Sequence, residues 1–235
     1  MKIYISHSVG CAGWDLPAIY EGTTFQNACR TMRFKVADKG LVKMLDWDYK
    51  EWKKDPEKVE KRHLELCQEE NFEVVMSMDL WKDNVQEALD FADMLQDYTD
   101  RVLVPAHYYP PELINYQVAY PNANWFAKNV FPPVDYHDNI THLLGGSPQS
   151  QLRLAALFPN IQSVDGNQIF NVAIRHGKYW TWKRGKGDCW IKPRREMSND
   201  EIFKRSVQNV DHTWRQGIKP QLTMLDFYTP GGAEY

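Results

Sequence analysis

The stretch HLLGGSPQSQLRLAALFPNIQSVDGN, residues 142–167, decides the fold class. It begins with a short apolar segment, His142–Leu144, that leads into a pair of glycines. Leucines and alanines then recur at helical spacing, and a second apolar segment, Ile161–Val164, ends at Asp165. A strand, a helix and a strand in this order form a βαβ unit with parallel strands. The glycines and the carboxylate therefore follow strands at one edge of a sheet, the edge where such folds bind ligands.

Other segments repeat this design of an apolar run that ends in polar or glycine residues. They are Lys2–Ser6, Val74–Met78, Val102–Pro105 and, more weakly, Phe34–Ala37. Helical patterns over residues 48–70 and 84–98 separate them, whereas residues 108–138, rich in proline, asparagine and aromatic residues, predict an irregular excursion. This alternation indicates an α/β fold with a parallel sheet, open or closed into a barrel.

The length and composition of the chain predict a single domain over residues 1–235. Of the residues, 43% are hydrophobic and 25% are charged, which is typical of a globular protein with a sizeable core. A net charge of −3 means that any contact with nucleic acid must come from a local patch. The four cysteines are scattered without a C-x-x-C pair, which indicates reduced thiols in a cytoplasmic protein. No apolar run is long enough to cross a membrane, so no membrane partner is expected.

Two aspartates are the leading candidates for chemistry. Asp79 ends the apolar run VVMSMD, and a partly desolvated carboxylate there suits proton transfer or binding of a base edge. Asp165 ends SVD before a turn at Gly166-Asn167 and could attack an electrophilic carbon. Each aspartate is equally compatible with a structural role as a helix cap or turn residue. Two carboxylates on neighbouring strands can divide nucleophilic and acid/base work, as glycosyl transfer requires.

Several further residues are expected to line a substrate pocket. Gly145, Gly146 and Ser147 would let the backbone approach a ligand closely at a helix start, although a simple strand-to-helix turn explains them as well. His107, which closes VPAH, and Asn167, in the turn after Asp165, are the other candidates. Asp38 in VADKG also closes an apolar run. The dispersed histidines and cysteines offer no metal-ligand spacing, so no metal is expected.

A basic aromatic segment, RHGKYWTWKRGKGDCWIKPRR, spans residues 175–195. Lysine and arginine attract phosphates, and aromatic faces stack on unpaired bases. The candidate nucleic-acid-binding residues are Lys178, Lys183, Arg184, Lys186, Arg194 and Arg195. The alternative is a solvated hairpin whose tryptophans pack inward.

At the motifs GGSP, SVDGN and HGKYW the chain resembles the tRNA-guanine transglycosylase superfamily. It is more similar to the phage and bacterial branch that places 7-deazaguanines in DNA than to the tRNA enzymes. The resemblance is clearest over residues 141–180 and extends more weakly to VVMSMD and to VADKG, where Lys39 replaces the serine of the family's Asp-Ser-Gly motif. The tRNA enzymes carry a cysteine-rich zinc site after their aspartate nucleophile. Here Cys189 is the single cysteine after the matching residue, Asp165.

The resemblance implies a (β/α)₈ barrel of the triosephosphate-isomerase type, trimmed or irregular and without a zinc subdomain. It implies that Asp165 is the nucleophile, that Asp79 binds the base and that Asp38 is a general acid/base. Gly145 and Gly146 would line the base pocket. The partners would be DNA, or less favourably tRNA, and a 7-deazaguanine such as preQ0, with no cofactor. If the protein is phage-encoded, it would act in the cytoplasm of a bacterial host.

Two alternatives compete with a DNA-directed guanine transglycosylase. A nucleoside or base-processing glycosidase would use the same carboxylates with water as the acceptor. A catalytically inactive barrel would bind nucleic acid or a nucleotide and would tolerate the loss of Asp165.

Overall fold

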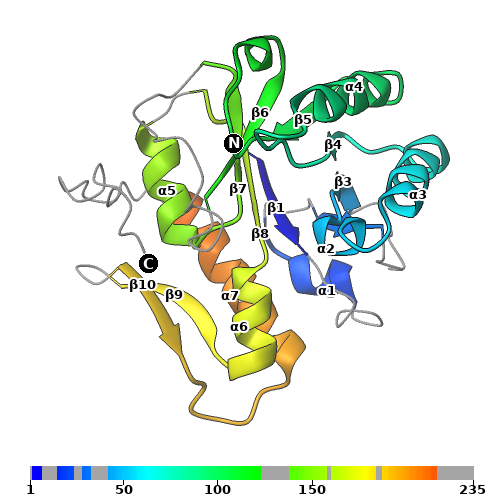
Figure 1. The fold of residues 1–235 in the computed structure, drawn as a ribbon. Coiled ribbons are helices and arrows are strands. Elements are labelled where there is room, and N and C mark those ends of the chain that lie inside the picture. Colours follow the sequence, from blue (N-terminus) through cyan, green and yellow to red (C-terminus); the bar gives the residue numbers. More distant parts are fainter. Residues whose placement is uncertain are drawn as a thin grey trace, which may run out of the picture.

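Eight short strands of the described chain form one parallel sheet that curls into a barrel (Figure 1). Their bounds are β1 Lys2–Ser6, β2 Ala28–Thr31, β3 Val42–Asp46, β4 Val74–Met76, β5 Val102–Pro105, β6 Gln117–Pro121, β7 Ile140–Leu144 and β8 Ser163–Gly166. The strands follow one another in chain order, and β8 closes the sheet by pairing in parallel with β1, with Tyr4 beside Asp165. All carboxyl ends of the strands therefore meet at the same edge.

The computed structural model describes residues 2–6, 15–23, 28–32, 42–122, 138–157, 160–183 and 187–215. The predicted strand Phe34–Ala37 and the candidates Asp38, Arg184 and Lys186 lie outside these ranges.

Helices surround the sheet and connect most of its strands. They are α1 Leu16–Tyr20, α2 Tyr49–Trp52, α3 Pro56–Glu69, α4 Val85–Gln96, the 3₁₀ helix η2 Pro111–Asn115, α5 Pro148–Leu157, α6 Gln168–His176 and α7 Asn199–Arg215. An α/β fold built on a parallel sheet is thus confirmed, and its arrangement is compatible with a TIM-like barrel. Among the described helices, none combines the length and apolar character needed to cross a membrane.

Strands β4 and β5 are apolar throughout because both faces of the sheet are covered there. Every residue of β4 and β5 is buried, which matches the unbroken apolar runs VVM and VLVP. Five predicted strands are confirmed as β1, β4, β5, β7 and β8, with small shifts of their ends.

Two expectations about local structure are wrong. Residues 108–138 contain η2 and β6, and β6 completes the sheet between β5 and β7.

Residues 48–70 form two helices rather than one. The second helix starts at Pro56, whose fixed φ suits a first turn, and the Asp55 side chain accepts a hydrogen bond from the backbone N–H of Lys58 at 3.2 Å.

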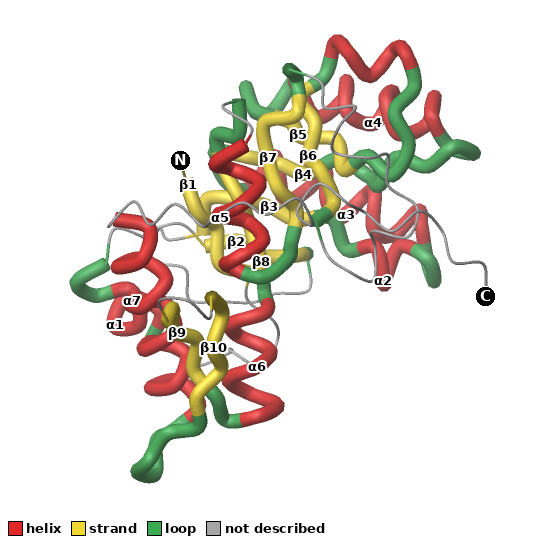
Figure 2. The backbone as a smooth tube through the Cα atoms, turned by 90° about the vertical axis from the view of Figure 1, so that its left-hand side faces the viewer, coloured by secondary structure: helices red, strands yellow, loops and turns green. Residues whose placement is uncertain are grey.

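A two-stranded antiparallel hairpin lies beside the barrel. It consists of β9 Tyr179–Lys183 and β10 Gly187–Ile191. The hairpin packs with α6 and α7, and Figures 1 and 2 both show this group away from α3 and α4. Gly177 ends α6 in the left-handed conformation, and β9 begins two residues later, at Tyr179.

Candidate active site

Asp165 lies on β8 with its side chain almost fully buried near the carboxyl edge of the barrel. Only 4% of the residue is exposed. Its Oδ1 accepts a hydrogen bond of 2.9 Å from the backbone N–H of Gly145, at the end of β7. The same oxygen lies 3.3 Å from Nε2 of His142, a fully buried residue of β7. The neighbouring strand β7 and the turn that follows it therefore hold the Asp165 carboxylate in place.

The glycine pair makes this contact possible. Gly145 and Gly146 have φ values of +74° and +89°, in the region that favours glycine. A Cβ on Gly146 would lie 2.5 Å from Nδ2 of Asn122. Gln151 of α5 donates to the carbonyl oxygens of both Gly145, at 2.9 Å, and Asp165. The predicted glycine turn and carboxylate thus form one connected unit.

Ser147 and Asn167 have mainly local roles. Ser147 and Ser150 exchange hydrogen bonds between side-chain oxygens and backbone N–H groups, which caps the start of α5. Asn167 is the exposed residue that precedes α6, and its side chain makes no capping hydrogen bond. Ser147 and Asn167 flank the Asp165 unit in the chain, one after the glycine pair and the other after Gly166.

Asp79 and His107 form a second polar pair at the same edge. Asp79 follows β4, and its Oδ1 lies 3.1 Å from Nε2 of His107, which follows β5 and is buried. The ring of Trp81 stacks on His107, with centroids 3.7 Å apart and planes 3° from parallel. Asn84 stabilises the loop by donating to the carbonyl of Asp79 at 2.9 Å and accepting from the N–H of Trp81 at 2.7 Å. The predicted candidates Asp79 and His107 are thus direct partners.

Asp46 is a third carboxylate that the sequence analysis missed. It ends β3 and is only partly exposed. Burial raises the pKa of Asp46 well above its usual value, and the negative charges of Asp165, Asp79 and Asp48 raise it further. Asp48 caps helix α2, because its side chain accepts a hydrogen bond from the backbone N–H of Glu51. A signal was present in MLD, an apolar run ending in a carboxylate as in VVMSMD.

These carboxylates can divide acid and base roles. Asp46, Asp79 and Asp165 come from different strands and lie close enough for the charges of the latter two to act on Asp46. An aspartate with a raised pKa can carry a proton at a pH where other carboxylates are ionised, which makes Asp46 suited to general acid catalysis. In the described residues, no three histidine, cysteine, aspartate or glutamate side chains are grouped to hold a metal ion.

Residues 19–215 match DUF6610, which is described as a family of unknown function. The chain belongs to this family. No curated protein and no solved structure matches the chain. The matched residues of this DUF6610 member include Asp46, Asp79, His107, His142 and Asp165, so the carboxylate group lies within the part that defines the family.

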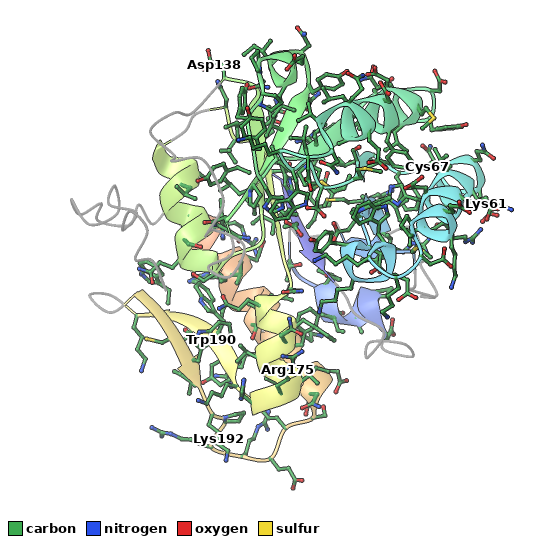
Figure 3. All side chains as sticks on the ribbon, viewed as in Figure 1. Lys61, Cys67, Asp138, Arg175, Trp190 and Lys192 are labelled. Carbon is green, nitrogen blue, oxygen red and sulfur yellow. The ribbon has the colours of Figure 1, made fainter. Side chains whose placement is uncertain are left out.

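The basic candidates of the DUF6610 chain lie apart from these carboxylates, around the hairpin. Lys178, Lys183, Arg194 and Arg195 are exposed. Figure 3 shows Arg175, Trp190 and Lys192 in the same lower part of the molecule, on or next to α6 and β10.

The tryptophans of the hairpin pack inward in part. Trp180 is fully buried and lies opposite Trp190 across the hairpin. Its backbone N–H donates to Ser206 of α7 at 2.9 Å, and its carbonyl accepts from Asn209 of α7 at 2.7 Å. Trp180 is therefore a core residue that cannot stack on a base, whereas Trp182 and Trp190 are partly exposed.

Proposed function

We propose that this protein is a guanine transglycosylase that acts on DNA and exchanges guanine for a 7-deazaguanine base such as preQ0. The observation that carries the proposal is the placement of Asp165, held by Gly145 and His142, at the same barrel edge as the carboxyl of Asp46, whose pKa is raised. The resemblance at GGSP and SVDGN adds support from the sequence. The fold that goes with this function is a trimmed (β/α)₈ barrel of the triosephosphate-isomerase type.

In the first step, a carboxylate oxygen of Asp165 attacks C1′ of the target nucleotide. The bond between C1′ and N9 breaks, and its electron pair leaves with guanine. Asp46 supplies the proton that the departing base needs, so guanine leaves as a neutral molecule. The product is a covalent ester between Asp165 and C1′.

In the second step, the incoming base takes the place of guanine. Its N9 attacks C1′ from the vacated side and passes its proton to the Asp46 carboxylate. The ester bond breaks, and Asp165 is released as a carboxylate. Two displacements at C1′ give net retention, as in other double-displacement glycosyl transfers.

Asp79 and the glycine turn recognise the base in this proposal. A carboxylate accepts hydrogen bonds, so Asp79 suits the N–H groups on the edge of guanine or a 7-deazaguanine. Its contact with buried His107 fixes the direction of that carboxylate. Gly145 and Gly146, with φ values of +74° and +89°, form the turn whose backbone would face the base in this proposal.

DNA would reach the site as a flipped or single-stranded nucleotide, because C1′ and the base edge are inaccessible inside a stacked duplex. The exposed basic residues around the hairpin would hold the phosphates. A cytoplasmic location, in the bacterial host if the gene is a phage gene, fits this substrate.

The test is release of labelled guanine from DNA, and separately from tRNA, with and without preQ0. We expect release from DNA that depends on preQ0. Asp165→Asn should abolish release and the covalent intermediate, because an amide is a far poorer nucleophile than a carboxylate. Asp55→Asn is the matched control, since asparagine caps a helix as well as aspartate and Asp55 lies at the start of α3.

The other outcomes separate the alternatives. Release of guanine without any acceptor base would identify a glycosidase that uses water. Binding of DNA without release from either polymer, unchanged in Asp165→Asn, would identify an inactive binding barrel.

A further inference from the structure

A chain of hydrogen bonds runs behind Asp165 through the barrel. Arg101, just before β5, donates from Nη2 to the Oγ of Ser163 at 2.7 Å. Ser163 Oγ lies 2.8 Å from Nδ1 of His142, and Nε2 of His142 lies 3.3 Å from Oδ1 of Asp165. Ser163 and His142 are fully buried. Arg101 and Ser163 lie at the amino-terminal ends of their strands, so the chain leads from that end toward the carboxyl edge.

One arrangement of protons gives every group in this chain of four a suitable partner. A guanidinium can only donate, so Ser163 accepts from Arg101 with its oxygen. In the described structure the remaining polar partner of the Ser163 hydroxyl is His142, so the hydroxyl proton points to Nδ1. With Nδ1 as acceptor, the neutral imidazole carries its proton on Nε2 and donates it to Asp165.

The electrostatics favour the neutral ring. Burial lowers the pKa of His142, and the positive charge of Arg101 lowers it too, although the contact with Asp165 acts in the opposite direction. Burial lowers the pKa of Arg101, and the nearby Tyr4 and Glu73 act in the opposite direction, but a guanidinium remains charged at neutral pH. A charged donor therefore stands at one end of the chain and a carboxylate acceptor at the other.

We infer that Arg101, Ser163 and His142 are positioning residues that lock the Nε2–H tautomer of His142 and thereby orient the Asp165 carboxylate. This role rests on the proposed function in that Asp165 is the nucleophile. The imidazole and the Gly145 N–H converge on Oδ1, so the carboxylate plane is set by two donors from β7 and its turn. The opposite tautomer would turn a nitrogen lone pair toward the carboxylate and repel it.

The first test measures the tautomer itself and needs no substrate. Nitrogen-15 correlation spectra of the imidazole rings, with His142 assigned by its loss in His142→Gln, distinguish Nε2–H, Nδ1–H and the doubly protonated ring. We expect Nε2–H at pH 7 in the wild type and a mixture of tautomers in Ser163→Ala. Ser77→Ala is the matched control, because Ser77 is also fully buried but donates to the carbonyl of Ala88. An Nδ1–H or doubly protonated ring in the wild type, or an unchanged tautomer in Ser163→Ala, overturns the inference.

The second test measures guanine exchange. Ser163→Ala should lower kcat roughly tenfold to a hundredfold with little change in KM. Removing the hydrogen-bond partner that orients a functional histidine has a cost of this size at metal sites, where the histidine binds the metal. Ser163→Thr, which keeps the hydroxyl, should restore most of kcat. A kcat in Ser163→Ala equal to that of Ser77→Ala would overturn the positioning role. If the wild type shows no exchange at all, the proposed function fails, and the spectra alone then decide whether the tautomer is locked.

Should Ser163→Ala fail to fold, Arg101→Gln tests the other end of the chain through the titration of the His142 ring rather than through its tautomer. Arg101 is only partly buried, and glutamine keeps a donor without the charge. We expect the Nε2–H tautomer to persist in Arg101→Gln, with the pKa of the ring raised toward its ordinary value. A ring whose titration does not change would overturn the part assigned to Arg101.

Discussion

Gly145 donates its backbone N–H to Oδ1 of Asp165 at 2.9 Å, so a turn after β7 directly holds a carboxylate of β8. The bond joins residues that are 20 positions apart and come from the two ends of one βαβ unit. It explains why the sequence has a glycine pair at this point, because the turn must bend sharply to aim an N–H at the neighbouring strand. Substitutions in the turn should therefore affect both stability and exchange.

Gly146→Ala should destabilise the protein and reduce exchange strongly. Its φ of +89° is strained for alanine, and the new Cβ would lie 2.5 Å from Asn122 Nδ2 and 2.8 Å from Ser150 Oγ. We expect a loss of about 2–4 kcal/mol in the free energy of unfolding, from backbone strain and overpacking together. Gly22→Ala is the control, because Gly22 has a φ of +72° but open space around its Cβ position, and about 1–2 kcal/mol is expected there. Equal losses measured by urea unfolding would mean that the close approach has no cost.

Asp46→Asn should stabilise the fold while it abolishes exchange. The pKa of Asp46 in the folded protein lies above its usual value, so the folded protein binds a proton at Asp46 more tightly than the unfolded chain does. The stability that the protonated side chain contributes is therefore present at low pH and is lost as pH rises through the folded-state pKa. Asparagine resembles the protonated side chain and has no charge to bury. The variant should therefore gain stability over the wild type as pH rises above 4, while kcat falls roughly 10²- to 10⁴-fold because the general acid is gone. An Asp46→Asn variant that is inactive but no more stable than the wild type at pH 8 would contradict a raised pKa for Asp46 in the folded protein.

His63 should make the protein less stable in mild acid. Burial lowers the pKa of His63 to about 4, although its contact of 3.0 Å with the carbonyl of Met76 acts in the opposite direction. The unfolded chain binds the proton near pH 6.5, so this stability is present above pH 6.5 and is lost as pH falls toward 4. The loss between pH 7 and pH 5 should be about 2 kcal/mol, and His63→Gln should remove it. Parallel stability curves for the two proteins would show that His63 titrates alike in both states.

The sequence identified those strands whose apolar runs are uninterrupted. VVM and VLVP are buried on both faces, so composition alone marks them, and the carboxylate after such a run marks Asp79 and Asp165 as candidates. Strands β2, β3 and β6 were not predicted, because their sequences ACRT, VKMLD and QVAYP include polar residues and their pairing depends on neighbours far along the chain.

Because β3 was not predicted, the carboxylate at its end, Asp46, was not predicted as a site residue either. The raised pKa of Asp46 depends partly on other carboxylates that lie near it in the barrel, and these are far from it in the sequence. The chain behind Asp165 was hidden for the same reason. Arg101 and Ser163 are separated by 62 residues and meet only because the barrel closes. Periodicity reports which face of an element is buried, whereas these contacts depend on which strands become neighbours.

The exposed basic residues around the hairpin should determine the salt dependence of DNA binding. Each phosphate contact that releases a counterion adds about 0.7–0.9 to the slope of log affinity against log salt. A variant with Lys178, Lys183, Arg194 and Arg195 replaced by alanine should therefore bind more weakly and show a slope reduced by up to about 3. The control replaces four exposed lysines, Lys50, Lys54, Lys58 and Lys61, around α2 and α3, away from the hairpin in Figure 3. Both variants change the net charge equally, so a general electrostatic effect would lower both slopes alike. A reduced slope for the hairpin variant alone would locate the phosphate contacts there, whereas an unchanged slope in that variant would place the DNA elsewhere on the barrel.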